Sequence, residues 1–227
     1  MTIGPYNPLD KLSLARSIEA EILSREIKPM DTTEIISGAG VYVIYYRGGF
    51  EPYSVLSEAN KDDWNRPIYV GKAIPKGGRK GGIRRDAAAR GTALGSRLRK
   101  HAESIRATSN LKIGDFVFRH IVLDDIWIPL GENILIETFK PLWNVAIEGF
   151  GINDPGAGRL KQMRSPWDVL HPGRGYADRL TGGGPDLEAV LGRVEDYCQG
   201  RPLKPLPKRL EEAAKIASED DRGEVEG

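Results

Sequence analysis

The segment 41–46 constrains the fold more than any other part of the chain. It reads Val-Tyr-Val-Ile-Tyr-Tyr, so β-branched and aromatic residues fall on both of its alternating faces. A strand that is apolar on both faces is typical of the interior of a sheet, where neighbouring elements cover it from two sides. Gly38-Ala39-Gly40 precedes the segment and Gly48-Gly49 ends it. We therefore expect this segment to be a central strand.

Apolar periodicity and chain-breaking residues predict the remaining elements. Two further strands are expected at 67–71 and 116–123. Helices are expected at 8–27, 94–105, 129–140 and 186–197. Beyond residue 144 the chain is rich in glycine and proline, and a proline-punctuated linker at 201–207 precedes a charged final helix.

Composition excludes several classes of protein. The 227 residues suffice for one large domain or for a small domain with elaborations. No stretch approaches about 18 consecutive apolar residues, so no membrane span is expected. The first residues lack the basic and apolar segments of a secretory signal. A lone Cys198 excludes an internal disulfide framework and favours a reducing cytoplasm, and the three histidines are too separated for a zinc-type cluster.

The net charge of +1 hides an uneven distribution of charge. Residues 66–106 hold twelve basic and two acidic side chains, a net charge of +10, whereas residues 211–227 hold seven acidic and two basic ones, a net charge of −5. The basic block is typical of a surface that binds a polyanion, although a solvated, salt-bridged surface has the same composition. Glycines at 77, 78, 81 and 82 alternate with the bases. This favours a flexible loop along a phosphate backbone over a helix face.

Glu132 stands out on the helix expected at 129–140. It shares the spacing i, i+3, i+4, i+7 with Leu135, Ile136 and Phe139, so its carboxylate lies on the stripe that faces the core. A carboxylate in that position needs a cation or a metal as its partner. The alternative is a glutamate near a helix N-terminus that complements the helix dipole.

Other polar and aromatic residues are weaker candidates when each is taken alone. Arg97 and His101 share one side of the helix at 94–105, because they are four residues apart, but they fit the exposed side of a basic helix equally well. Tyr42 and Tyr69 lie in strand segments and by themselves fit a core. Structural roles are expected for the two other histidines, at 120 and 171.

Taken together, these residues resemble the GIY-YIG nuclease superfamily over about residues 38–145. The resemblance is carried, in this order along the chain, by Gly40-Val41-Tyr42, Tyr69-Val70-Gly71 followed by Lys72-Ala73, Leu94-Gly95-Ser96-Arg97-Leu98-Arg99, Glu132-Asn133-Ile134-Leu135-Ile136 and Pro141-Leu142-Trp143-Asn144.

The chain departs from small members of the superfamily in two ways. The insertion 74–93 separates the second tripeptide from the arginine helix, and His101 stands where many members carry a tyrosine. With the long additions at both ends, these features are similar to the type II restriction endonucleases of the superfamily, some of which cut GC-rich palindromes such as CCGCGG.

The resemblance implies a fold class and a division of the chain. The fold is expected to be α+β, with a small three-stranded mixed or antiparallel sheet flanked by helices and with helical and loop elaborations at both ends. The expected parts are an N-terminal helical arm at 1–38, a nuclease core at 39–145 with the basic insertion loop 74–93, a DNA-binding and dimerisation elaboration at 146–200, and a linker and charged tail at 201–227.

The resemblance also implies metal-dependent hydrolysis of DNA phosphodiesters that leaves 5′-phosphate ends. Tyr42 would take the proton from water, and Arg97 would bind phosphate oxygens as charge develops. Glu132 would hold one divalent metal, Mg²⁺ or Mn²⁺.

Supporting roles are implied for three further residues. Tyr69 and His101 would orient water, Tyr42 or phosphate, and Asn144 would fix the site by local hydrogen bonds. A phenol with an unperturbed pKa of about 10 is a poor base at neutral pH. The general base is therefore Tyr42 or, alternatively, His101 or Lys72.

Two basic segments are expected to contact DNA. Arginine is the commonest reader of guanine, and lysine mainly contacts phosphates. The expected DNA-binding residues are Lys76, Arg79, Lys80, Arg84, Arg85 and Arg90 in the insertion loop and Arg159, Lys161, Gln162 and Arg164 downstream. A palindromic site implies a homodimer with two-fold symmetry.

The expected partner is double-stranded DNA, with no membrane and no nucleotide cofactor. Val70-Gly71-Lys72-Ala73 lacks the upstream glycine spacing and the Ser or Thr of a phosphate-binding loop. A repair or homing-type nicking endonuclease of the same superfamily is an alternative function. A non-catalytic DNA-binding module would be expected to have lost Tyr42, Arg97 or Glu132, and all three are present.

Overall fold

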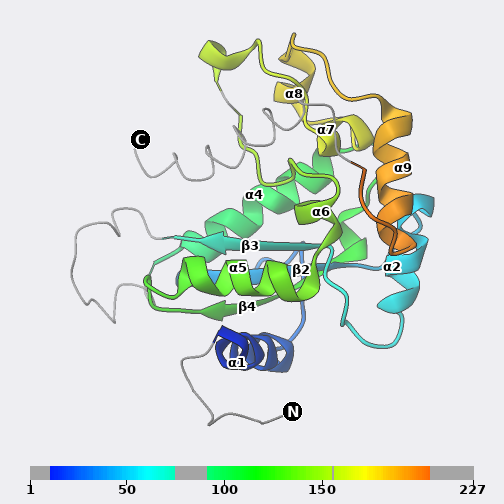
Figure 1. Ribbon diagram of the computed structural model, residues 1–227. Helices are drawn as coiled ribbons and strands as arrows, with labels where there is room; N and C mark the ends of the chain where they lie inside the picture. The colour runs from blue at the N-terminus through cyan, green and yellow to red at the C-terminus, as the bar shows by residue number, and fades with distance from the viewer. Residues whose placement is uncertain (1–10, 75–90, 155, 205–227) are drawn as a thin grey trace.

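The computed structural model describes residues 11–74, 91–154 and 156–204 (Figure 1). The strands are β1 (Lys28–Pro29), β2 (Gly40–Tyr46), β3 (Tyr69–Ala73) and β4 (Phe116–Val122). The α-helices are α1 (Lys11–Ser24), α2 (Ser54–Ala59), α4 (Ala93–Ala107), α5 (Ile128–Phe139), α6 (Leu142–Val145), α7 (Pro166–Leu170), α8 (Gly175–Arg179) and α9 (Leu187–Cys198). The 3-10 helices are η1 (Glu51–Tyr53), η2 (Ile113–Asp115) and η3 (Ala157–Arg159). Within the described ranges, no helix combines the length and the apolar character that crossing a bilayer requires.

One antiparallel sheet joins the strands in the order β1-β4-β2-β3. The expected α+β class is confirmed, and β2 lies inside the sheet as expected. The expected number of strands was wrong, because β1 pairs Lys28 with Phe118 and Pro29 with Val117. A two-residue strand shows no alternation in the sequence, and its proline is tolerated because β1 is an edge.

Several element boundaries also differ from the sequence prediction, and two of them have a clear physical reason. Strand β3 begins at Tyr69 rather than at Pro67, since proline has no backbone N–H for the ladder. Ile68 makes the first such bond, from its N to Ile44 O at 2.8 Å. Helix α1 ends at Ser24, before residue 27, because the chain must extend there to enter β1.

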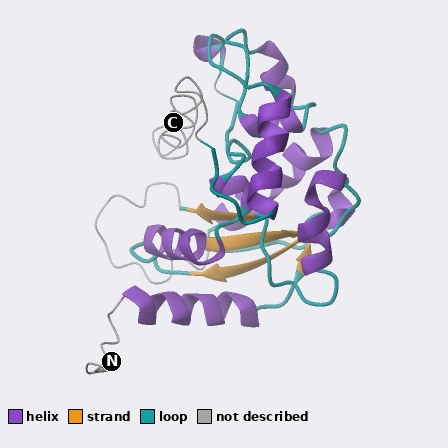
Figure 2. Ribbon diagram, turned by 45° about the vertical axis from the view of Figure 1, so that its right-hand side comes forward, coloured by secondary structure: helices purple, strands orange, loops and turns teal. Residues whose placement is uncertain are grey.

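The alternation of side chains along β2 separates two hydrophobic clusters. Val41 and Val43 face one side, where Ile22 of α1 and Leu135 of α5 pack against them. These four side chains have no exposed surface. Figures 1 and 2 show α1 on the side of the sheet away from α7, α8 and α9. Helices α1 and α5 therefore cover one face of the sheet.

The other face of the sheet carries the larger cluster. Tyr42 and Ile44 of β2 pack there together with Trp143 of α6, Trp167 of α7 and Val190 of α9, all at most 1% exposed. Segments that are distant in sequence thus complete one core on this face. The chain beyond Val145 returns to the sheet as part of that core, and any change in its packing acts on the residues around Tyr42.

His171 is fully buried in the larger cluster. Its Nδ1 donates to Asn110 Oδ1 at 2.9 Å, because the Asn110 amide nitrogen itself donates to Leu170 O. Its Nε2 accepts the Tyr53 hydroxyl at 2.5 Å. Burial, and secondarily the charge of Arg174, lowers the pKa of His171 to about 3. Its burial and its two bonded ring nitrogens agree with the structural role expected for this histidine.

The low pKa of His171 predicts a loss of stability in acid. The unfolded ring takes up a proton near pH 6.5, whereas the folded ring does so only near pH 3. The contribution of the neutral ring is therefore complete above about pH 6.5 and declines toward pH 3, by up to about 1.4 kcal/mol per pH unit. Urea unfolding at about pH 7 and about pH 5 measures this slope. His171→Asn should show a smaller slope than the natural chain, and equal slopes would contradict the prediction.

Candidate active site

Five elements supply the seven candidate catalytic residues. Tyr42 lies on β2, Tyr69 and Lys72 lie on β3, and the remaining four lie on helices, with Arg97 and His101 on α4, Glu132 on α5 and Asn144 on α6. All of these elements meet at β3: α4, α5 and α6 each contact it, and β2 pairs with it.

An aromatic cluster on the larger-core face brings together Tyr42, Tyr69 and His101. The Tyr42 hydroxyl lies 2.6 Å from His101 Nε2, a hydrogen bond whose donor depends on the histidine tautomer. The ring of Tyr69 lies 5.3 Å from that of His101 and 6.3 Å from that of Tyr42. His101 is 2% exposed, and burial lowers its pKa well below the usual 6.5, with a further contribution from the charges of Arg97 and Arg174. The imidazole beside Tyr42 is therefore neutral near pH 7.

Gly71 makes room for the Tyr42 ring. The two residues are partners in the register between β2 and β3. A Cβ at position 71 would lie 2.4 Å from Tyr42 Oη and 2.8 Å from Tyr69 Cε1. Side chains that are directly opposite in an antiparallel pair share a face, so only a glycine lets the phenol lie across β3 toward α4.

Lys72 and Glu132 form an ion pair on the opposite face of β3. Lys72 is the register partner of Val41, so its side chain points toward α5. Its Nζ donates to Glu132 Oε2 at 2.6 Å. Glu132 is 7% exposed, which confirms that its carboxylate lies on the core-facing side of the helix. In this structure the cation that a buried carboxylate requires is the ammonium of Lys72.

Asn144 closes the outer edge of β3. Its Oδ1 accepts from Val70 N and its Nδ2 donates to Val70 O, both at 2.8 Å. Trp143 N donates to Ile68 O at 2.9 Å, two residues earlier on the same edge. Asn144 thus takes the place of a further strand and fixes the segment that carries Tyr69 and Lys72.

Arg97 is held by the loop that follows α6. Its Nη2 donates to Gly151 O at 2.8 Å, and Asn153 Oδ1 lies 3.5 Å from its Nη1. Phe150 of the same loop stacks on the His101 ring, with centroids 4.4 Å apart and an angle of 18° between the planes. The loop therefore contacts both polar residues of α4 that the sequence placed together.

The expected DNA-binding residues fall into two groups. Those of the insertion loop lie outside the described residues, namely Lys76, Arg79, Lys80, Arg84, Arg85 and Arg90. The downstream group, Arg159, Lys161, Gln162 and Arg164, lies beside α8 at the end of the molecule away from α1 (Figure 1).

Backbone bonds attach this downstream segment to residues 181–183. They run from Thr181 N to Leu160 O at 2.8 Å and from Arg164 N to Gly183 O at 2.8 Å. The side chains of Arg159 and Lys161 are exposed, whereas Arg164 Nε donates to Ala177 O at 2.9 Å. The segment thus presents two exposed cations, and Arg164 also has a structural contact.

Sequence reasoning missed three residues that shape the site. Phe150 and Gly151 contact His101 and Arg97, and Arg174 binds the backbone of their loop. The segments 149–151 and 165–174 resemble the restriction branch in sequence, but no role in the site was predicted for Phe150 or Arg174. The one available signal is the pair of glycines around Phe150, which indicates a close approach of the backbone to another group.

His120 shares the sheet face of Tyr42, because the two residues are register partners between β2 and β4. Its ring contacts Phe118, with centroids 5.8 Å apart. Burial lowers its pKa, and the charge of Lys28 adds to this effect. Its strand position agrees with the structural role expected for it.

Comparison with known proteins identifies one family. A family model described as the Eco29kI GIY-YIG domain matches residues 34–198, well over half of the chain. The match continues past Val145 to the end of α9, and it therefore includes the loop that holds Arg97. No curated protein matches the chain.

The close approach of Gly71 to Tyr42 predicts the effect of a single added methyl group. In Gly71→Ala the new Cβ meets Oη and Cζ of a ring with no exposed surface, so the ring must leave its position and its bond to His101. The free energy of unfolding should fall by roughly 1–3 kcal/mol, as measured by chemical denaturation. Gly49→Ala is the matched control, because nothing lies within 4 Å of its added Cβ. Equal stability of the two variants would contradict the assignment.

Proposed function

We propose that this chain, which belongs to the family of the Eco29kI GIY-YIG domain, cuts both strands of DNA at a short, GC-rich palindrome. That family is one of type II restriction endonucleases. Membership of this family makes the chain a restriction-type GIY-YIG nuclease, whose substrate is DNA. The observation that carries the proposal is the bond between the Tyr42 hydroxyl and the neutral, buried His101, beside the arginine of the same helix.

Proton transfer is assigned to Tyr42 and His101. When Nε2 of the neutral His101 carries no proton, the phenol donates to it. The lone pairs of the phenol oxygen would then accept the attacking water once DNA binding admits one to this buried hydroxyl. As that water attacks phosphorus, its proton passes to Tyr42 while the phenol proton passes to Nε2. This arrangement lets a group with an ordinary pKa of about 10 act near pH 7, because no free phenolate has to form first.

Charge stabilisation is assigned to Arg97. A guanidinium donates in a planar fork that matches two phosphate oxygens, and its charge opposes the negative charge that develops during attack. The Gly151 carbonyl fixes one of its nitrogens, so the direction of the fork is set before DNA binds. Tyr69 packs against His101 and completes the wall of the cluster.

The residues present fit a single divalent metal. GIY-YIG nucleases generally depend on one, and Glu132 provides a shielded carboxylate that already binds a cation, Lys72. Within the described part of the chain, no group of three or more His, Cys, Asp or Glu side chains could form a metal cage. One carboxylate suits Mg²⁺ or Mn²⁺, because such an ion keeps several waters and takes its other ligands from phosphate. When bound, the metal would act as a Lewis acid toward the leaving 3′ oxygen, so the products carry 5′-phosphates.

Recognition of DNA is assigned to the two basic segments and to a second copy of the chain. The exposed Arg159 and Lys161 and the bases of the insertion loop would contact phosphates and guanine edges. A palindrome is read by a two-fold symmetric pair, so we propose a homodimer that places one site on each strand.

The substitution Glu132→Gln tests the function directly. It keeps the shape of the side chain and removes its charge, so DNA binding should persist and cleavage should fall by at least about 100-fold. Supercoiled plasmid with Mg²⁺, followed by sequencing of the ends, measures both the cut and its position. Glu137→Gln, on the exposed side of the same helix, is the control and should cut normally.

The plasmid assay has three informative outcomes with the natural chain and one with the variant. Linear products with one short palindrome at every end would support the proposal. Nicked circles alone would indicate a nicking enzyme, and an intact plasmid would indicate a non-catalytic DNA-binding protein. Full activity of Glu132→Gln would exclude this carboxylate as the metal ligand.

Tyr42→Phe tests the proton transfer. The variant keeps the ring in place and removes only the hydroxyl that bonds to His101, so the rate of cleavage should fall by about 100- to 10,000-fold. Tyr45→Phe is the matched control, because its buried hydroxyl accepts from Arg119 on the other face of the same strand. A normal rate in Tyr42→Phe would move the role of base to His101 or Lys72.

A further inference from the structure

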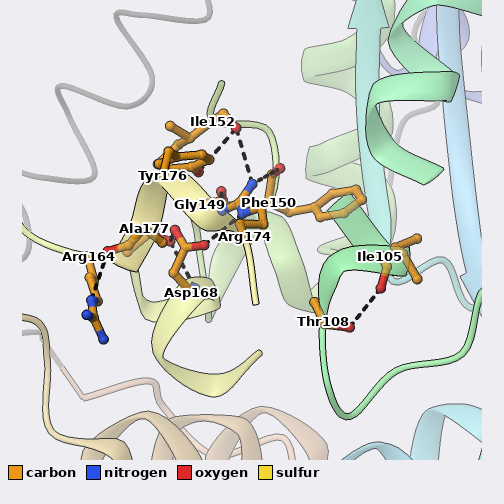
Figure 3. Close-up of polar contacts among 11 residues, drawn as sticks. Ile105, Thr108, Gly149, Phe150, Ile152, Arg164, Asp168, Arg174, Tyr176 and Ala177 are labelled. Carbon is orange, nitrogen blue, oxygen red and sulfur yellow. Dashed lines mark hydrogen bonds and ion pairs between the residues drawn. The ribbon is translucent and has the colours of Figure 1, made fainter. Parts of the chain in front are cut away.

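A buried arginine lies behind the candidate active site. Arg174 and Asp168 are each 4% exposed, and Arg174 Nε donates to Asp168 Oδ1 at 2.7 Å (Figure 3). Ser165 Oγ donates to the second oxygen of Asp168 at 2.7 Å, so the carboxylate is itself held. The guanidinium lies over the Trp167 ring, 4.4 Å from its centroid. This ion pair is a built feature of the interior and is not a surface contact.

The guanidinium of Arg174 binds three backbone carbonyls of one loop. Its Nη2 donates to Gly149 O at 2.8 Å, and its Nη1 donates to Phe150 O at 3.1 Å and Ile152 O at 3.2 Å. Figure 3 shows these oxygens converging on the end of the Arg174 side chain. One residue therefore satisfies most of the carbonyls of the turn 149–152, whose orientation depends on that residue.

The loop fits tightly between Arg174 and the active site. Gly149 has φ +116°, and a Cβ there would lie 2.1 Å from Ser165 Oγ. A Cβ at Gly151 would lie 2.8 Å from Tyr69 Oη and 3.3 Å from Arg97 Nη2. Because both glycines allow an approach that no other residue would, the loop is pressed against the catalytic groups on one side and the Ser165 region on the other.

The same loop provides the contacts that orient the catalytic groups. The Gly151 carbonyl accepts from Arg97, and the Phe150 ring stacks on His101 and meets Tyr69 edge-on, with centroids 4.9 Å apart. Arg174 thus binds the backbone of Phe150, which stacks on His101, and of Ile152, which follows the Gly151 that binds Arg97.

We propose that Arg174, fixed by Asp168, is a positioning residue that holds the segment 149–152 against Arg97 and His101. The expected effect on the rate rests on the proposed nuclease function. The positioning of the segment 149–152 by Arg174 does not depend on that function. Without the guanidinium, the Phe150 carbonyl loses its donor, and the Gly149 and Ile152 carbonyls keep only the longer bonds from Ile152 N at 3.3 Å and Tyr176 Oη at 3.4 Å. The loop is then held less firmly and rearranges to satisfy the buried carbonyl. Arg97 then loses the carbonyl that directs its fork, and His101 loses the ring that packs on it.

The test substitutes Arg174→Lys, which keeps the positive charge and removes the planar fork. We expect the single-turnover rate at saturating plasmid DNA to fall by about 10- to 100-fold, since small misplacements of catalytic groups have effects of this size. The affinity for DNA, measured with Ca²⁺ in place of Mg²⁺, should stay within about two-fold. A lower rate with unchanged affinity would distinguish misplaced catalytic groups from a defect in DNA binding.

Arg193→Lys is the matched control for stability. Arg193 also donates to backbone carbonyls, Ala146 O at 2.6 Å and Val145 O at 3.2 Å, but it does not bind the segment 149–152. Both variants should lower the melting temperature, and only Arg174→Lys should slow cleavage. An equal loss of rate in the two variants would overturn the proposal, because it would mean that any weakened arginine clamp has this effect.

Histidine NMR gives a readout that does not depend on activity. The chain has three histidines, and the ring protons of His101 are shifted by the stacked Phe150, whereas His120 contacts Phe118 on β4. In Arg174→Lys the His101 signals should move while those of His120 stay. Unchanged His101 signals would overturn the proposal. If the natural chain cuts no DNA but the His101 signals move as expected, the proposed function fails and the positioning by Arg174 stands.

Discussion

The hydrogen bonds along the outer edge of β3 are the constraint on which the site depends. An edge strand exposes unpaired N–H and carbonyl groups, and here Asn144 and Trp143 take them up at Val70 and Ile68. The strand cannot shift by one residue without breaking both contacts. Such a shift would exchange the faces of its side chains and would place a side chain, in the position of Gly71, against the Tyr42 ring.

Because side chains alternate along β3, the candidate catalytic residues lie on both faces of the sheet. Lys72 points to α5 and neutralises Glu132, whereas Tyr69 and Gly71 face α4, where His101 binds Tyr42. The carboxylate and the phenol are therefore held by separate cores, one formed with α1 and α5 and the other with the C-terminal helices. This separation keeps the buried anion away from the neutral imidazole of His101, whose pKa is lowered by burial and then by the charge of Arg97.

The sequence predicted the candidate residues that lie in elements with a regular pattern of apolar side chains. Glu132 was found because it interrupts an apolar helical stripe, and the central strand was found because both of its faces are apolar. The resemblance implied that Asn144 fixes the site by hydrogen bonds, but its partner, Val70 on the edge strand, follows only from the fold. The two-residue strand β1 is too short for any period. Arg174 and Asp168 were not recognised, because an ion pair between two irregular segments leaves no pattern. Their partners are backbone carbonyls, which every residue possesses.

The burial of Arg174 and Asp168 is better explained by the placement of the segment 149–152 than by a gain in stability. Removing two charges from water costs several kcal/mol for each ion, and well-packed apolar replacements of such pairs are often at least as stable. An apolar side chain at position 174 would, however, leave the Phe150 carbonyl without its donor and would leave those of Gly149 and Ile152 with only the longer bonds from Ile152 N and Tyr176 Oη. A lysine could not reach them in one plane, whereas the guanidinium fork reaches all three while Asp168 balances its charge. Because these carbonyls belong to the turn that contacts Arg97 and His101, the proposed role of the buried arginine follows from the geometry of the candidate active site.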